Sequence, residues 1–97
     1  MGYFFRRSST RRVNDFLAVH GPARCVAAVA ALNALAADPQ RIASEWERCE
    51  LALVHDVPDC PPATKPALRR ALEDCAGVCR NRDVARRIMV VRDSLLP

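Results

Sequence analysis

Five cysteines are the residues of this 97-residue chain with the widest range of possible chemistry. They are Cys25, Cys49, Cys60, Cys75 and Cys79. Cysteines at this density can form disulfides, bind a metal or act as nucleophiles, and otherwise they pack as small buried hydrophobes. An odd number leaves at least one thiol unpaired when the others pair within the chain. Their role therefore depends on which cysteines the secondary structure brings together.

The positions of Cys49 and Cys75 favour a disulfide between them. Cys49 lies thirteen residues before Pro62 and Cys75 thirteen residues after it. A helical hairpin that turns near Pro62 would place both on facing apolar seams, with Cα atoms about 4.4–6.8 Å apart. Closing that loop would stabilise the fold by about 2–4 kcal/mol. Reduced, buried thiols are the alternative, because connectivity cannot be read from one sequence.

Neither a metal site nor a catalytic site is predicted. Cys75 and Cys79 lie one helical turn apart, but structural zinc usually takes two such pairs and the chain has one. His20 and His55 are isolated in sequence, and the three glycines form no phosphate-binding loop or nucleophile elbow. We therefore expect no enzyme activity and no cofactor.

The cysteine spacing over residues 45–80 invites comparison with the cysteine-stapled helical hairpins of the mitochondrial intermembrane space. Those hairpins carry twin Cys-x9-Cys or twin Cys-x3-Cys pairs. Here Cys49 and Cys60 form Cys-x10-Cys, whereas Cys75 and Cys79 form Cys-x3-Cys. Glu45 stands where a twin Cys-x3-Cys pattern requires cysteine. Because the two pairs differ, we assign no family.

The elements that must position these residues are helices. Apolar residues recur at helical spacing, and no strand-like alternation appears. We predict an all-α fold, a small antiparallel bundle or array of four to five short helices, in one domain over residues 9–97. Gly21-Pro22 and Asp38-Pro39 mark helix restarts, Asn81 caps the last helix, and the proline-rich segment 57–66 is the connector. The expected apolar seams are Val13, Phe16, Leu17 and His20; Cys25, Val29, Leu32 and Ala36; Ile42, Trp46, Cys49 and Leu53; Leu68, Leu72, Cys75 and Cys79; and Val84, Ile88, Val91 and Leu95.

A basic, aromatic N-terminal arm, residues 1–8, precedes this domain. The formal net charge is +4, and residues 1–24 carry all of it, because residues 25–97 hold ten basic and ten acidic side chains. The arm and the start of the first helix are predicted to bind a partner, which can be a protein subunit, RNA or acidic lipid head groups. The predicted partner-binding residues are Tyr3, Phe4, Phe5, Arg6, Arg7, Arg11 and Arg12. The longest apolar run, Cys25–Ala37, is too short to span a bilayer.

These features predict a non-catalytic accessory or structural subunit of a larger assembly, which acts through contacts with other protein subunits. The arginine-rich, acid-free segment 1–14 resembles a mitochondrial targeting sequence in composition. It favours a mitochondrial respiratory-chain or ATP synthase complex, with a cytoplasmic location as the alternative. Two other functions stay open: an RNA-contacting protein of a ribosome-like particle, and a small bacterial or phage regulator that binds a protein.

Overall fold

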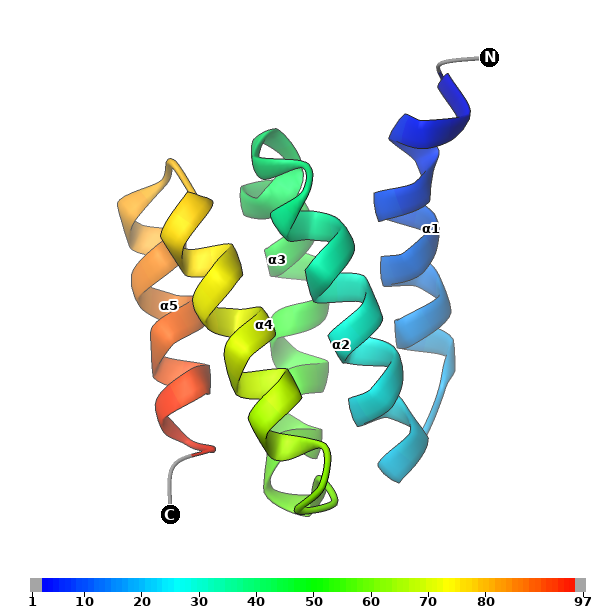
Figure 1. Cartoon of the computed structure of the whole chain (residues 1–97), viewed down its shortest axis with the longest axis vertical. Coiled ribbons are helices and arrows are strands. Elements are labelled where there is room, and N and C mark those ends of the chain that lie inside the picture. The colour runs from blue at the N-terminus through cyan, green and yellow to red at the C-terminus, as the bar shows by residue number, and fades with distance from the viewer. Residues whose placement is uncertain (1–2, 96–97) are drawn as a thin grey trace.

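The structure, a computed structural model, describes the backbone of residues 3–95 and the side chains of residues 11–95. Within that range the chain is helical and contains no strand, so the all-α prediction is confirmed (Figure 1). The helices are α1 (Tyr3–Ala18), α2 (Pro22–Ala36), α3 (Pro39–Asp56), α4 (Lys65–Val78) and α5 (Arg82–Asp93), with a short 3-10 helix η1 (Val57–Asp59) after α3.

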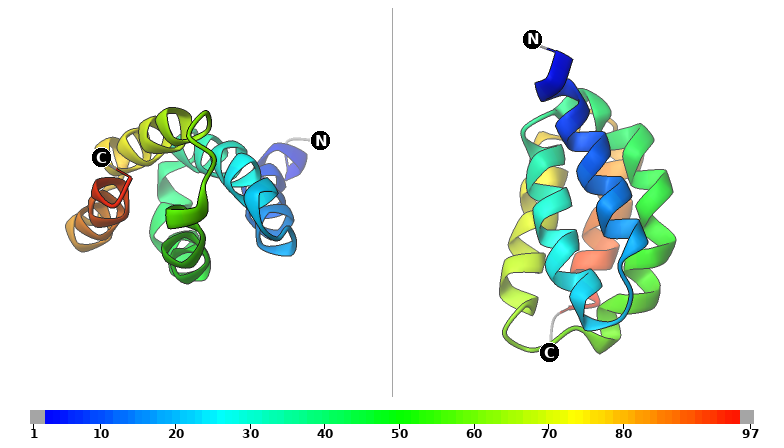
Figure 2. Two further views of the ribbon diagram at one scale, coloured as in Figure 1. Left: turned by 90° about the horizontal axis from the view of Figure 1, so that it is seen from below. Right: turned by 90° about the vertical axis from the view of Figure 1, so that its right-hand side faces the viewer.

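Four of the helices form a curved row and the fifth fills its hollow side (Figure 2). Along the row the order is α1, α2, α4 and α5, and α3 packs in the hollow, mainly against α2. Each helix runs antiparallel to the one before it in the chain (Figure 1). Because α3 lies outside the row and brings the chain back to the end of the bundle where α2 begins, α4 runs parallel to α2 beside it.

The turns explain where the helices begin. Gly21 has φ of 67°, a conformation that glycine adopts without strain, and Pro22 then opens α2. The Asn81 side chain accepts a 3.1 Å hydrogen bond from the Val84 amide, which confirms the predicted cap of α5. Asp38 does not cap α3 as expected: its side chain makes no cap hydrogen bond and instead pairs with Arg41 at 3.3 Å.

The core follows the predicted seams of the last three helices. On α3, Ile42, Trp46, Cys49 and Leu53 are all buried, as are the seam residues of α5. The indole nitrogen of Trp46 is a polar atom within this core and needs a hydrogen-bond partner. It donates to Glu50 Oε2 at 3.1 Å. On α2, burial extends beyond the predicted stripe to Ala28, Ala31 and Leu35, because this helix has neighbours on several sides.

The first helix begins earlier than the sequence predicted. We expected an arm over residues 1–8 and a helix from Ser9 or Thr10, but α1 begins at Tyr3. Residues 3–8 contain no proline or glycine that would interrupt a helix. The helix can therefore begin before the capping residues Ser9 and Thr10. Val13 and Phe16 are buried as expected, whereas His20, at the far end of the predicted face, is exposed.

The disulfide joins a different pair of cysteines from the one predicted. Cys25 and Cys60 are bonded, with Cα atoms 5.9 Å apart, and Cys49 and Cys75 are free thiols. The prediction assumed that α3 and α4 pack mainly on each other, but α4 packs in the row between α2 and α5. Cys25 in the first turn of α2 therefore meets Cys60, which precedes α4. The bond ties together the starting ends of two parallel helices that the chain connects only through α3.

Candidate functional site

Two of the three free thiols, Cys49 and Cys75, are poorly suited to nucleophilic or metal chemistry. Burial raises the pKa of Cys49 to about 12 and that of Cys75 to about 12, so both are protonated at neutral pH. Cys75 Sγ donates to the Leu32 carbonyl at 3.0 Å, which shows how closely α4 approaches the backbone of α2. Cys79 is half-exposed, 3.5 Å from the Asn81 carbonyl. Among the described residues, no group of three or more His, Cys, Asp or Glu side chains could hold a metal.

The two histidines, isolated in sequence, reach one polar cluster beside the disulfide. Arg24 is its centre: Nε donates to the Val19 carbonyl at 2.6 Å, and a terminal nitrogen lies 3.0 Å from the Asp56 carboxylate. His20 Nδ1 lies 3.1 Å from Arg24, and His55 Nδ1 lies 3.1 Å from Asp56. Since Arg24 links the ends of α1 and α3 to the start of α2, the cluster acts as a joint between helices.

Of the predicted partner-binding residues, two have described side chains. Arg11 and Arg12 are exposed on α1 and have no ion pair with any residue whose side chain the structure describes. The side chains of Tyr3, Phe4, Phe5, Arg6 and Arg7 lie outside the described residues. The binding role of this segment therefore stays a prediction.

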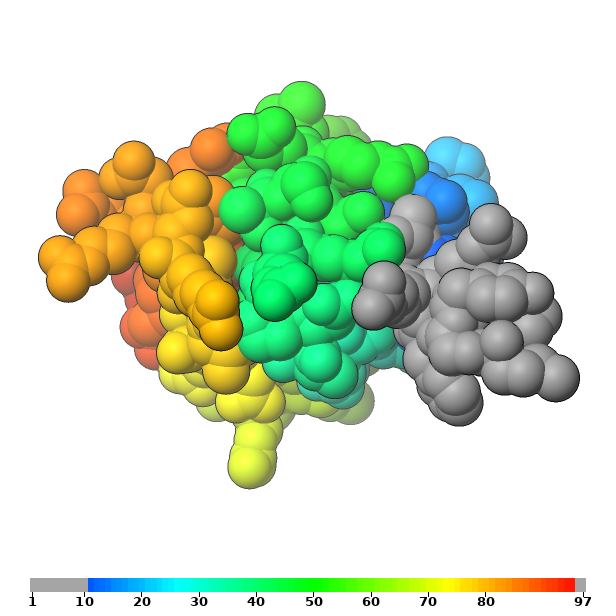
Figure 3. Space-filling model, turned by 90° about the horizontal axis from the view of Figure 1, so that it is seen from above, coloured from blue at the N-terminus to red at the C-terminus, as the bar shows by residue number. Residues whose placement is uncertain are grey.

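A shallow apolar groove runs between α4 and α5 on the outer side of the row. We call it the α4–α5 groove; its lining residues are Glu73, Ala76, Gly77, Ala85, Arg86 and Met89. Small side chains and one methionine form its floor, and Glu73 and Arg86 are its charged borders. The groove lies beside the turn between the two helices, which forms one edge of the molecule seen from above (Figure 3).

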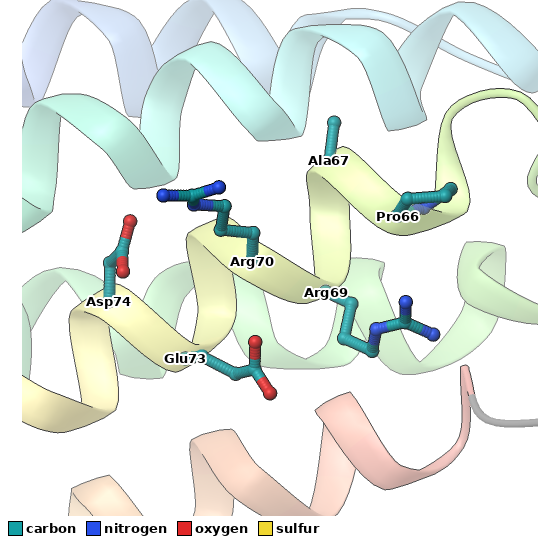
Figure 4. Close-up of a pocket in the computed structure, with 6 residues that line it drawn as sticks. All are labelled: Pro66, Ala67, Arg69, Arg70, Glu73 and Asp74. Carbon is teal, nitrogen blue, oxygen red and sulfur yellow. The ribbon is translucent and has the colours of Figure 1, made fainter.

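A second, more polar hollow lies on α4 and shares one lining residue, Glu73, with the groove. Pro66, Ala67, Arg69, Arg70, Glu73 and Asp74 line it. Figure 4 shows Arg69 and Glu73 on the side of α4 that faces α5, and Arg70 and Asp74 on the side that faces α2. Glu73 belongs to both surfaces and accepts a 3.0 Å hydrogen bond from Arg92 of α5. That ion pair neutralises the acidic residue of the groove.

Arginines without carboxylate partners lie in and near this groove. Arg69, Arg80, Arg82 and Arg86 form no ion pair with the described residues. Asp83 lies four residues before Arg87, a spacing that commonly gives an ion pair on a helix. Arg87 instead hydrogen-bonds to Glu50 of α3, and this bond lowers the pKa of the Glu50 carboxyl. Asp74 and Asp83 therefore have no ion pair with a described residue either, but the four arginines outnumber them.

Gly77, in the floor of the groove, is the residue that sequence reasoning missed. It is the last residue but one of α4, with a helical backbone, and a Cβ added there would meet nothing within 4 Å. Glycine in the interior of a helix costs roughly 1 kcal/mol relative to alanine, which is the upper bound for a position in the last turn. Neither backbone conformation nor packing within the described chain requires it. Its position in a helix that is otherwise well formed is the one signal that the sequence held.

The described part of the chain contains no helix long and apolar enough to cross a membrane. Five large apolar side chains from four helices are exposed: Val26, Leu51, Val54, Val78 and Val90. None of the five lines the α4–α5 groove. Comparison of the chain with protein-family models, with curated proteins and with solved structures finds no match in any of the three.

Proposed function

We propose that this protein is a non-catalytic helical subunit of a larger assembly and that it binds a protein through the α4–α5 groove. One observation carries the proposal: the apolar groove is open to solvent, with arginines at its border that the fold does not pair. Interfaces between proteins typically combine an apolar centre with a polar rim that is enriched in arginine. The protonated, buried thiols support a role that depends on binding and not on catalysis.

As part of the same proposal, we place the assembly in an oxidising compartment, with the mitochondrial intermembrane side of a respiratory-chain or ATP synthase complex as the leading candidate. Two features support this location. The Cys25–Cys60 disulfide persists where glutathione does not reduce it. The arginine-rich segment 1–14 has the composition of a mitochondrial targeting sequence.

The unpaired arginines favour one second candidate, an RNA-contacting protein of a ribosome-like particle. Arg82 and Arg86 lie one turn apart on an exposed face of α5 and could contact successive phosphates. Phosphate contacts give a binding constant that falls steeply with salt, whereas burial of an apolar surface is much less sensitive to salt. Salt dependence therefore separates the two candidates.

The test is the size of the native complex that contains the chain. In an extract of the source cells, we expect the 10.7 kDa chain to elute with a much larger complex that resists both ribonuclease and 0.5 M salt. Gly77→Trp should fill the groove and shift the chain towards its monomeric size. Gly77→Ala is the matched control, because it adds only one methyl group. Elution of the native chain as a monomer would contradict the proposal, and a shift after ribonuclease treatment would favour the RNA candidate.

A further inference from the structure

We infer that the α4–α5 groove takes an amphipathic helix of a partner protein, and that this helix carries acidic residues beside its apolar stripe. The inference rests on the proposed function, since it names the chemistry of the segment that the groove would bind. It follows from the shape of the floor and the charge of the rim.

The floor fits a helix that approaches closely. The antiparallel helices α4 and α5 lie on either side of a depression. Its floor consists of Ala76, Gly77 and Ala85, with Met89 at one side. Helices approach each other most closely where the contact residues are small, and methionine adapts to varied apolar partners. Gly77 costs stability in α4 while its missing side chain leaves open space inside the groove. A partner helix that packs at this position would make use of that space.

The rim selects the charge of the partner. Arg86 lines the groove, Arg69 lines the adjoining hollow, and Arg82 precedes Arg86 by one turn of α5. None of the three has an ion pair with a described residue, whereas Glu73 is already paired with Arg92. Asp74 and Asp83 are the acids of this face without such a pair, so arginine still predominates. Acidic side chains at the edge of a docked helix would meet these cations and would raise the association rate.

The same charges disfavour two other occupants. A second copy of this chain would bring its own arginines against Arg82 and Arg86 if the groove packed on itself. The chain's own first fourteen residues contain four arginines and no acid, so they would also be repelled. RNA would satisfy the arginines, but phosphates and sugars would leave the apolar floor uncovered. An acidic amphipathic helix matches both the floor and the rim.

Site-specific photo-crosslinking in the source cells tests this inference. A photoreactive phenylalanine derivative replaces Met89, a groove residue that already has a long side chain, in one variant. In a control variant it replaces Leu51, which is 80% exposed on α3 away from the groove. We expect the crosslinks from position 89 to map onto one segment of another protein. That segment should have apolar residues at i, i+3, i+4 and i+7 with flanking Asp or Glu.

The captured segment is then made as a peptide, and its binding to the purified full chain is measured. We expect Gly77→Trp to weaken binding at least tenfold and the double variant Arg82→Glu/Arg86→Glu to weaken it about tenfold. Arg70→Glu is the matched charge control, because Arg70 is on the other side of α4; it should change binding less than twofold (Figure 4). Circular dichroism of each variant confirms that the fold is retained.

The outcomes separate the inference from the proposed function. Crosslinks from position 89 to a protein segment without acidic residues or without an apolar stripe would overturn the inference and leave the proposed function standing. Crosslinks from position 89 to a second copy or to RNA would overturn the inference and the protein partner that the proposed function assigns to the groove. Crosslinks to protein from position 51 alone would contradict the groove as the binding surface, and so both the inference and that part of the proposed function. If neither position captures a protein, both the inference and the proposed function fail.

Discussion

Removal of the Cys25–Cys60 disulfide should cost this protein a large part of its stability. The bond closes a loop of 35 residues that contains most of α2, all of α3 and η1. In the chain-entropy model, a loop of this length stabilises the folded state by about 4 kcal/mol. Domains of this size have a total free energy of unfolding of about 5–15 kcal/mol. We therefore expect the double variant Cys25→Ser/Cys60→Ser to melt about 15–30 °C below the parent protein.

Urea unfolding followed by circular dichroism measures this effect. The parent protein is unfolded with and without a reducing agent, next to the double serine variant. The reduced protein and the variant should have similar free energies of unfolding, both about 4 kcal/mol below the oxidised protein. Cys79→Ser is the control, because it removes a half-exposed free thiol and should change stability by less than about 0.5 kcal/mol. Equal stability of the oxidised and reduced protein, with the bond confirmed by mass, would refute the loop-entropy reasoning.

Four further predictions concern the free thiols, Gly77 and Glu50. In the native protein at pH 8, a thiol reagent should modify Cys79 quickly and Cys49 and Cys75 slowly or not at all, and after unfolding without reductant it should count three thiols; a count of five would show that the disulfide is absent. Because the folded-state pKa values of Cys49 and Cys75 lie above the ordinary thiol value of 9.0, the free energy of unfolding should decline as pH rises above about 9, as alkaline urea titrations will show. Gly77→Ala should raise the free energy of unfolding by about 0.5–1 kcal/mol, and a destabilised variant would show that the site is not the open helical position seen here. Glu50→Gln should cost about 1 kcal/mol or less at pH 7. The difference should shrink as pH falls below the ordinary value of 4.5 and vanish below the lowered folded-state pKa, because the carboxylate stabilises the fold fully only above 4.5.

The sequence predicted which faces of the helices are buried, because each face is set by local spacing. The seam Ile42, Trp46, Cys49 and Leu53 repeats at intervals of four, three and four, and a helix necessarily places these side chains together. The same holds for α5. Turn chemistry was also readable at Gly21 and Asn81, because these residues have conformations or side-chain bonds that few others provide.

Neighbour relations between helices could not be predicted in the same way. An apolar seam shows that a helix packs on something, but it does not identify the partner. Cys49 and Cys75 do come near each other, since the charge of Cys49 contributes to the raised pKa of Cys75. Yet their thiols donate to backbone carbonyls of Trp46 and Leu32, and the bond forms where α2 and α4 lie side by side. The packing of α2 against α4, two helices separated in the chain by α3, cannot be predicted from local sequence patterns.

The α4–α5 groove escaped prediction for a related reason. No residue of its floor stands out in the sequence by itself. Ala76 and Gly77 come from α4, and Ala85 and Met89 come from α5. Local spacing also suggests the wrong partner for Arg87, because Asp83 is four residues away along the chain whereas Glu50 approaches from α3 in space. The Arg87–Glu50 pair leaves Asp83 without an ion pair to a described residue, and Arg82 and Arg86 still outnumber it. The basic rim also includes Arg69 of α4, so it is a property of the fold and not of α5 alone.

The disulfide and the proposed binding surface lie towards opposite ends of the molecule. The disulfide and the Arg24 cluster join the end of the bundle where α2 and α4 begin (Figure 1). The groove lies towards the other end, where α4 turns into α5. The ion pairs of Glu50 and Glu73 hold α5 against α3 and α4. Because separate contacts secure the two ends, substitutions in the groove can change binding without loosening the covalent joint. The unfavourable helix glycine is tolerable at position 77 for the same reason: the roughly 1 kcal/mol that it costs is small beside the stabilisation that the 35-residue loop closure supplies.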